Sequence, residues 1–116
     1  MGAYEMPFKR ITLIPKVDLT AKRYCAVTVD STGKAILPAA KAAIVGILQE
    51  PNNVDQPAQV MVSGVSFVIL KGAVAAGAEV EVTADGTVQT LTDGKAVGIC
   101  LVGGADGAIG SILLNR

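Results

Sequence analysis

The apolar residues of this chain come in short runs, and glycine, asparagine or aspartate separates most runs from the next. Short runs between such turn signals are typical of strands, whereas a helix needs an apolar stripe that recurs every three or four residues. The alternation is plain where Val80 and Val82 follow Glu79 and Glu81, which predicts a strand with one buried face and the two glutamates on the other. We expect strands at residues 9–14, 24–29, 34–37, 43–49, 58–65, 66–70, 79–83, 87–90, 96–101 and 108–114.

Length and composition indicate one β domain with an aliphatic core. The chain has 116 residues, of which 51% are apolar but only 3% aromatic, and it has no tryptophan. The core must therefore consist of Val, Ile, Leu and Ala, and β-branched side chains pack well on pleated strands. A chain of this length buries about two thirds of its unfolded surface, enough for a core without disulfides or metals. We expect an all-β fold, a small compact β-barrel or sandwich of about 8–10 short strands.

Two stretches of the chain resemble each other weakly, which suggests a duplicated β unit. The segment AVTVDSTGKAI at 26–36 aligns with EVEVTADGTVQ at 79–89, at an offset of 53. The match continues from KAAIVGIL at 41–48 onto GKAVGICL at 94–101, where the offset becomes 52 or 53 depending on the placement of one gap. Chance similarity between alternating hairpins is the alternative explanation. The approximate repeats are residues 24–65 and 77–114.

Glycines occupy matching positions in the two repeats. Gly33 and Gly86 fit the tight hairpins that each repeat predicts, because such turns need a positive φ. Gly46 and Gly98 lie inside predicted strands, where a glycine indicates a bulge or a close approach of two backbones. Each repeat is therefore expected to run as a strand, a glycine-centred hairpin, a second strand, a loop and a strand that contains Val-Gly-Ile.

The segment before the first repeat differs in composition. Residues 1–22 are more basic and contain Pro7 and Pro15, so we expect an extended N-terminal arm followed by an edge strand that lies outside the repeat. Residues 23–116 are expected to form the single β domain. The proline-bounded polar stretch at 50–57 is typical of an exposed loop.

The sequence offers no residues suited to catalysis, to a metal or to a cofactor. It has no histidine, so Cys–His nucleophiles and Cys/His metal sites cannot form. Glu79 and Glu81 are explained by the polar face of a strand, and the glycine-rich run at 103–107 lacks the Lys-Ser/Thr pair of a phosphate loop. Cys25 and Cys100 are expected to be buried free thiols, with a single disulfide left open. We expect no enzyme activity and no cofactor.

Charge and hydropathy exclude two classes of partner. The formal net charge is zero, and the chain lacks the basic excess and the stacking aromatics of a nucleic-acid binder. The longest strongly apolar run, VSFVIL at 65–70, is far shorter than the roughly 20 residues that span a membrane. We therefore expect no nucleic acid and no membrane, and synthesis in the cytoplasm. Residues 1–41 have a net charge of +4 and the remainder −4, which suits a surface that meets a protein of complementary charge.

Five motifs in order resemble the head decoration proteins of tailed bacteriophages, also called capsid cement proteins. The motifs are VTVDSTGKA, VGIL, the V-x-V-x-G strand at 60–64, AAGAEVEVTADG and GAIGSILL, and together they cover about residues 20–114. The resemblance implies a structural virion protein that binds the outer surface of the capsid and stabilises the head. It also implies the major capsid protein and further copies of the chain, as a homotrimer, as partners. The alternatives are a tail or fibre domain, a small ligand-binding barrel, a lipoyl-type carrier domain and an enzyme fragment.

The N-terminal arm is the predicted binding segment, and it is also where the chain departs from the family pattern. We expect residues 1–16 to extend from the barrel and to add a strand to a neighbouring subunit or to the capsid, with apolar anchors at alternating positions and basic side chains facing acids on the partner. A disordered tail is the alternative. Outward apolar positions at Ile36, Val68, Leu70 and Leu113 are further candidates for an interface. The predicted binding residues are Tyr4, Met6, Phe8, Lys9, Arg10 and Lys16.

Overall fold

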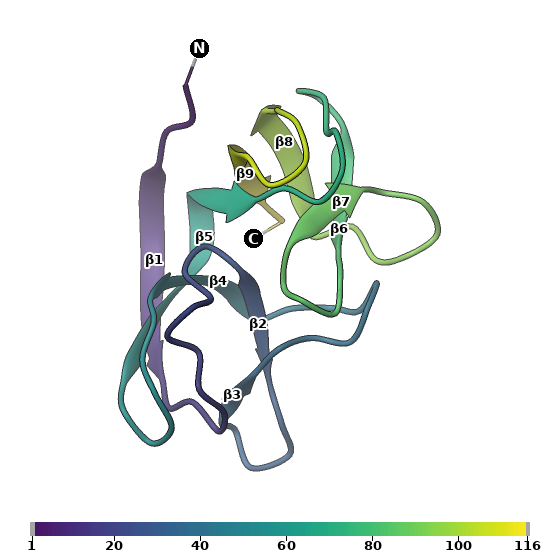
Figure 1. The fold of residues 1–116 in the computed structure, drawn as a ribbon. Helices are drawn as coiled ribbons and strands as arrows, with labels where there is room; N and C mark the ends of the chain where they lie inside the picture. The colour runs from purple at the N-terminus through teal and green to yellow at the C-terminus, as the bar shows by residue number, and fades with distance from the viewer. Residues whose placement is uncertain (1, 116) are drawn as a thin grey trace.

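The computed structural model describes residues 2–115, and of Pro7 and Phe8 it describes the backbone only. Over this range the chain forms nine strands and no helix, and the named strands pair only in antiparallel fashion (Figure 1). The prediction of an all-β fold is confirmed. The strands are β1 (Met6–Leu13), β2 (Ala26–Val29), β3 (Ala35–Ile36), β4 (Gly46–Glu50), β5 (Ala58–Ile69), β6 (Glu79–Val82), β7 (Val88–Thr90), β8 (Gly98–Val102) and β9 (Ile109–Leu114).

Strand β5 connects the two halves of the molecule. The sequence predicts separate strands at 58–65 and 66–70, but the structure has one strand of 12 residues. Its first part pairs with β1 and β4, and its second part pairs with β9. Gly64 lies where the partners change and has a φ of 105°, which glycine adopts without the clash that a Cβ would cause. One strand therefore serves as the last strand of the first half and the first strand of the second.

The pairings of the first half recur in the second half. The strand order is β3-β2-β4-β5-β9-β8-β6-β7, so that β2, β3 and β4 have their counterparts in β6, β7 and β8. A register shift follows Leu48 in β4, and another follows its counterpart Cys100 in β8. The paired residues correspond at offsets of 53 and 52, as Thr28–Ile36 corresponds to Glu81–Gln89, and Ile47–Met61 to Ile99–Leu113.

Strand β1 is also part of this repeat. It pairs with the first part of β5 as the second part of β5 pairs with β9, and each half closes at one parallel bridge, Pro15 to Ala35 and Leu70 to Val88. The next residue of each half donates its backbone N–H to the same bridge partner. The expectation that residues 1–22 lie outside the repeat is therefore wrong for the strand. Sequence comparison missed the match because main-chain pairing, not side-chain identity, defines it.

Each half has its own apolar core. The smaller cluster lies inside the first half and includes Val27, Leu48 and Val60. The larger cluster contains ten residues from the range 68–114 in the second half, together with four residues of the first half. Those four residues are Ala26, Ile44, Ile47 and Met61. The first half is thus joined to the second by apolar side chains as well as by β5.

Gly46 and Gly98 sit where two backbones approach closely, as their positions in the repeats predict. A Cβ at Gly46 would lie 2.2 Å from the carbonyl oxygen of Met61. A Cβ at Gly98 would lie 2.4 Å from the carbonyl oxygen of Leu113, the counterpart of Met61. Any other residue would therefore push β4 away from β5, or β8 away from β9.

Candidate interaction surface

The structure places the predicted binding segment in the chain's own sheet. Residues 6–13 form β1, which pairs with β5 over its whole length, so the segment does not extend away from the barrel (Figure 1). The physical reason is that Ile11 and Leu13 pack against the core of the first half. Within residues 2–115 no strand pairs with the other edge of β1. The sequence of this edge strand includes Pro7 and two cations, features that limit unspecific pairing of edge strands.

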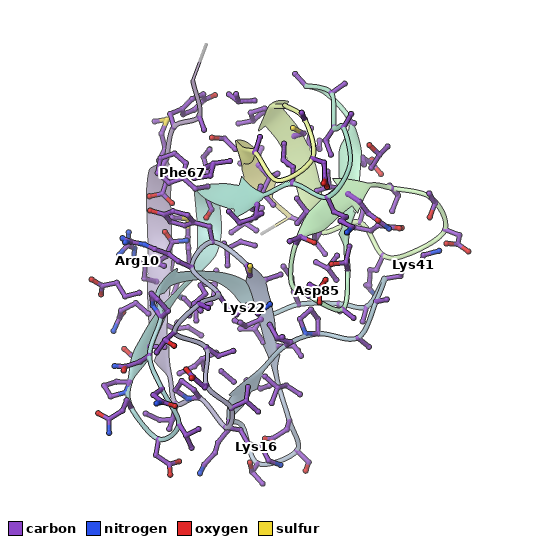
Figure 2. All side chains as sticks on the ribbon, viewed as in Figure 1. Arg10, Lys16, Lys22, Lys41, Phe67 and Asp85 are labelled. Carbon is purple, nitrogen blue, oxygen red and sulfur yellow. The ribbon has the colours of Figure 1, made fainter. Side chains whose placement is uncertain are left out.

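The predicted residues separate into two groups. Tyr4, Met6, Lys9 and Arg10 are exposed along the N-terminal segment and the first part of β1, and we call these four residues the N-terminal surface. Figure 2 shows Arg10 pointing outward from β1, while Lys16 lies at the far end of the molecule. The side chain of Phe8 lies outside the described residues.

Lys16 has a structural contact instead of a place on this surface. Its Nζ lies 3.0 Å from Oδ2 of Asp30, which opens the β2–β3 turn. Hydrogen bonds from the hydroxyl of Thr32 and from Lys16, with smaller contributions from backbone N–H groups, hold the pKa of Asp30 well below its usual range. The pair links the end of β1 to the first hairpin, and Lys16 is not brought together with Lys9 and Arg10.

An apolar row crosses the sheet next to the N-terminal surface. Met6 of β1 lies opposite Val65 of β5, Val65 opposite Leu113 of β9, and Leu113 opposite Ile99 of β8. Directly opposed residues project from the same face of a sheet. Met6 is 65% exposed, Leu113 43% and Ile99 39%, whereas Val65 is buried, so three of the four apolar side chains of the row face solvent. Ile109 is also exposed and lies on β9 in the same alternation as Leu113.

Hydrogen bonds fix the N-terminal residues beside this row. The backbone N–H of Tyr4 donates to Oγ of Ser111 over 2.7 Å, and the hydroxyl of Ser111 donates back to the carbonyl of Tyr4. The carboxylate of Glu5 accepts from the backbone N–H of Phe67. These bonds hold Tyr4 next to β9, between the exposed Ile109 and Leu113.

Aromatic side chains form a second fixed element nearby. The rings of Tyr24 and Phe67 meet edge to face with centroids 5.2 Å apart, and the guanidinium of Arg23 lies 5.1 Å from the centre of the Tyr24 ring. Nε of Arg23 also donates to the carbonyl of Gln49. Two of the four aromatic residues of the chain therefore stabilise the face that contains Val65 and Phe67. Sequence reasoning missed this contact because the two rings come from segments 43 residues apart.

The outward positions expected from the sequence are only partly right. Leu113 is exposed, as expected, and Ile36 is half-buried. Val68 and Leu70 are buried in the larger core. The alternation itself holds, because Ser66, Val68 and Leu70 are buried while Phe67 and Ile69 are half-buried, but the side that holds Val68 and Leu70 faces the larger core and not the solvent.

The glutamate expected on an outer face is a buried structural residue. Glu81 has no exposed surface, and both neighbouring valines are buried as well. Its carboxylate accepts hydrogen bonds from the side chains of Gln89 and Thr92 and from the backbone N–H groups of Thr92 and Gly94. Burial raises the pKa of Glu81, but these four bonds outweigh it and lower the pKa to about 2. A carboxylate so fully bonded is an ionised clamp for residues 89–94 and a poor proton donor.

The remaining candidates for chemistry are accounted for by packing. Cys25 and Cys100 are buried free thiols, and burial raises the pKa of both. In the part of the chain that the structure describes, no three residues among Asp, Glu and Cys gather as metal ligands would. No helix long and apolar enough to cross a membrane occurs between residues 2 and 115.

A groove lies between the two halves, away from the N-terminal surface. It has a volume of about 270 Å³, and most of its lining comes in pairs from matching positions of the repeat, such as Val62 and Leu114. Lys95 is the only charged residue of its lining. The lining offers no combination of acid, base or nucleophile.

Comparisons with known proteins give a fold likeness. No protein-family model matches the chain, and no curated protein matches its sequence. Among solved structures, the chain is similar to the N base of the head fibre gp8.5 of bacteriophage phi29, with a TM-score of 0.73 and 16% sequence identity. The match covers 93% of this chain and 94% of the other. The two therefore share one fold over nearly their whole length.

Proposed function

We propose that this chain is a structural protein of a bacteriophage virion that binds the outer surface of the head and stabilises it. The observation that carries the proposal is the full-length fold likeness to the base of a phage head fibre. The order of motifs in the sequence supports the same assignment independently, because it resembles that of head decoration proteins. We propose the major capsid protein and further copies of the chain as partners, and the capsid surface as the location.

The physical properties of the molecule suit a protein that works by adhesion. The strands of residues 2–115 enclose two apolar cores, and an exposed apolar row lies next to exposed cations. Binding to a shell with many equivalent sites multiplies a modest affinity, so no deep pocket is needed. We propose no catalytic role, no cofactor, and no contact with nucleic acid or membrane.

The N-terminal surface is the proposed contact with the capsid. Tyr4 and Met6 supply apolar area, and Lys9 and Arg10 supply charge for acidic groups on the partner. The open edge of β1 offers backbone groups to which a capsid strand can add. This replaces the idea of an arm that reaches out: the segment binds from its place in the sheet.

Binding to heads tests this proposal directly. Purified protein is mixed with expanded empty heads and sedimented, and the bound fraction is compared for the wild type, Lys9→Glu with Arg10→Glu, and the control Lys71→Glu. Lys71 is exposed in the second half, so its reversal changes the net charge without touching the N-terminal surface. We expect the double variant to lose most of its binding and to show a weaker salt dependence, with the control unchanged. Equal binding by all three would overturn the N-terminal surface as the contact.

The second candidate is the base of a head fibre, which the name of the similar structure favours. A cement protein occupies many sites of the shell and raises the temperature at which heads rupture. A fibre base occupies its sites to hold a projecting domain, and it need not change rupture at all. Counting bound copies per head and measuring head rupture by calorimetry separates the two. Saturation without any gain in head stability would favour the fibre base.

A further inference from the structure

The second half exposes a row of residues whose counterparts in the first half are buried. In the first half, Ala26 lies opposite Ile47, and Ile47 lies opposite Met61. All three residues are 0% exposed. In the second half, the corresponding row runs through Glu79, Ile99 and Leu113, which are all exposed. We call these two sets the first-half row and the second-half row.

The first-half row is buried because the second half covers it. The cluster that contains Ala26, Ile47 and Met61 takes every other member except Ile44 from residues 68–114. Backbone hydrogen bonds tie the same parts together, since Ala26 donates to the carbonyl of Gly86 and Lys41 to that of Val82. The second half therefore packs against the row of the first half, and the two halves have the same fold.

The side of the second half that covers the first-half row has a less buried counterpart on the first half. Val82 and Leu114 of the second half are buried in the cluster that covers the first-half row. Their counterparts in the first half, at the same offsets of 53 and 52, are Val29 and Val62, and both are only half-buried. Val62 packs beside the core of the first half and lines the groove between the halves. Within one chain, the second half packs on the first-half row. The second-half row and the side of the first half around Val29 and Val62 are the two surfaces that a second contact of the same kind would need.

We propose that the second-half row binds a second copy of this chain, and that the surface it meets is the half-buried side of that copy's first half around Val29 and Val62. The contact repeats between chains the packing that already joins the two halves within one chain. Because the two surfaces differ, it is heterologous, so each chain offers one of each kind and the chains join head to tail, into a ring where the rotation between successive chains closes and into a filament where it does not. Glu79, which takes the place of Ala26, adds a charge that limits unspecific association of the exposed row.

This inference names the surface for the copies of the chain that the proposed function includes, and it is tested without heads. Sedimentation velocity from low to high micromolar protein is compared for the wild type, Leu113→Asp, Ile99→Asp and the control Val54→Asp. Val54 is 44% exposed in the loop at 51–57, away from the row. We expect the wild type and the control to sediment as a multiple of the 11.8 kDa chain, and both row variants as monomers that circular dichroism shows to be folded.

A mixing experiment identifies the geometry. Leu113→Asp keeps the Val29 surface intact, whereas Val29→Asp keeps the row intact, so each variant alone should be monomeric. Mixed in equal amounts, they should form a dimer with one chain of each kind, because one good surface of each type remains. Val62→Lys replaces Val29→Asp if the latter melts at a lower temperature than the wild type.

The outcomes separate this inference from head binding. A wild type that stays monomeric at every concentration overturns the inference, and so do row variants that associate like the wild type. Monomeric row variants that fail to pair on mixing overturn the head-to-tail geometry. A monomeric wild type whose row variants lose head binding assigns the row to the capsid, which contradicts the inference but leaves the proposed function intact.

Discussion

Ile47 and Met61 lie opposite each other on β4 and β5 of the first half. Ile99 and Leu113 occupy the corresponding positions on β8 and β9 of the second half. The first pair is completely buried and the second pair is exposed. Both pairs are aliphatic, so the side chains themselves do not reveal which pair faces water. Two halves with the same backbone fold can therefore expose different residues, because the burial of a side chain depends on what packs against its half.

The two halves also differ in how they hold their loops. Glu81 in the second half binds residues 89–94 through four hydrogen bonds, whereas its counterpart Thr28 is half-buried and has a shorter side chain. The short contact between Lys41 and Asp93 adds a link from the first half to this loop. The second half thus gains order from polar contacts that the first half does not repeat.

The largest difference between the halves should appear when one charge is placed at matching positions. Met61→Asp buries a carboxylate in the joint core, and an unpaired buried charge costs several kcal/mol, which is comparable to the roughly 5–15 kcal/mol of total stability that domains have. Leu113→Asp leaves the new carboxylate in water. We expect Met61→Asp to be unfolded at neutral pH by circular dichroism and Leu113→Asp to melt like the wild type. Similar melting temperatures for the two would show that the first-half row is not covered in solution.

Adding a methyl group at Gly46 and at Gly98 tests whether the close backbone contact is equivalent in the two halves. Gly46→Ala and Gly98→Ala each place a Cβ against a backbone carbonyl that no rotamer change can move away. Each change should cost about 3 kcal/mol, at the upper end of what overpacking usually costs. The free energy of unfolding in urea measures both, with Gly2→Ala as the control because nothing lies within 4 Å of its added Cβ. A cost at one glycine but not at the other would contradict the equivalence of the two strand pairs.

Much of this architecture is predictable from the sequence. The period-two alternation gives most of the strands, and the glycine spacing gives the offsets of 52 and 53 that the pairings follow. The sequence predicts a strand at 9–14 but leaves it outside the repeat, because the match of β1 to the second part of β5 lies in main-chain pairing, which leaves no trace in side-chain identity. Glu81 was expected outside because alternation cannot show that both faces of β6 are covered.

The candidate surface is less predictable than the fold. Tyr4 and Met6 are exposed as expected, and Leu113 was among the expected outward positions. Ile99 was not singled out, because its apolar run looks the same as that of its buried counterpart Ile47. Exposure of one and burial of the other follow from tertiary packing, which a single sequence does not contain.

Acid should weaken the second half through the clamp that the first half lacks. The pKa of Glu81 in the folded chain is about 2, below its ordinary value of 4.5, so ionised Glu81 stabilises the fold above pH 4.5 and loses that effect as the pH falls toward 2. Glu81→Gln should be less stable than the wild type at neutral pH, and the difference should shrink over this interval. Melting temperatures at stepwise pH measure it, with the exposed Glu79→Gln as the control. A difference that stays constant from pH 5 to pH 2 would refute the clamp.

The smallest expected effects belong to two of the exposed ion pairs. Lys16 and Asp30 connect β1 to the first hairpin, while Lys41 and Asp93 connect the two halves. The lysines are about half exposed, and exposed pairs contribute little because water and salt screen them. Lys16→Met and Lys41→Met should each shift the urea midpoint only slightly, and the shift should vanish in high salt. A large, salt-resistant loss for Lys41→Met alone would mean that this pair, and not the apolar packing of Ile47 and Met61, holds the two halves together.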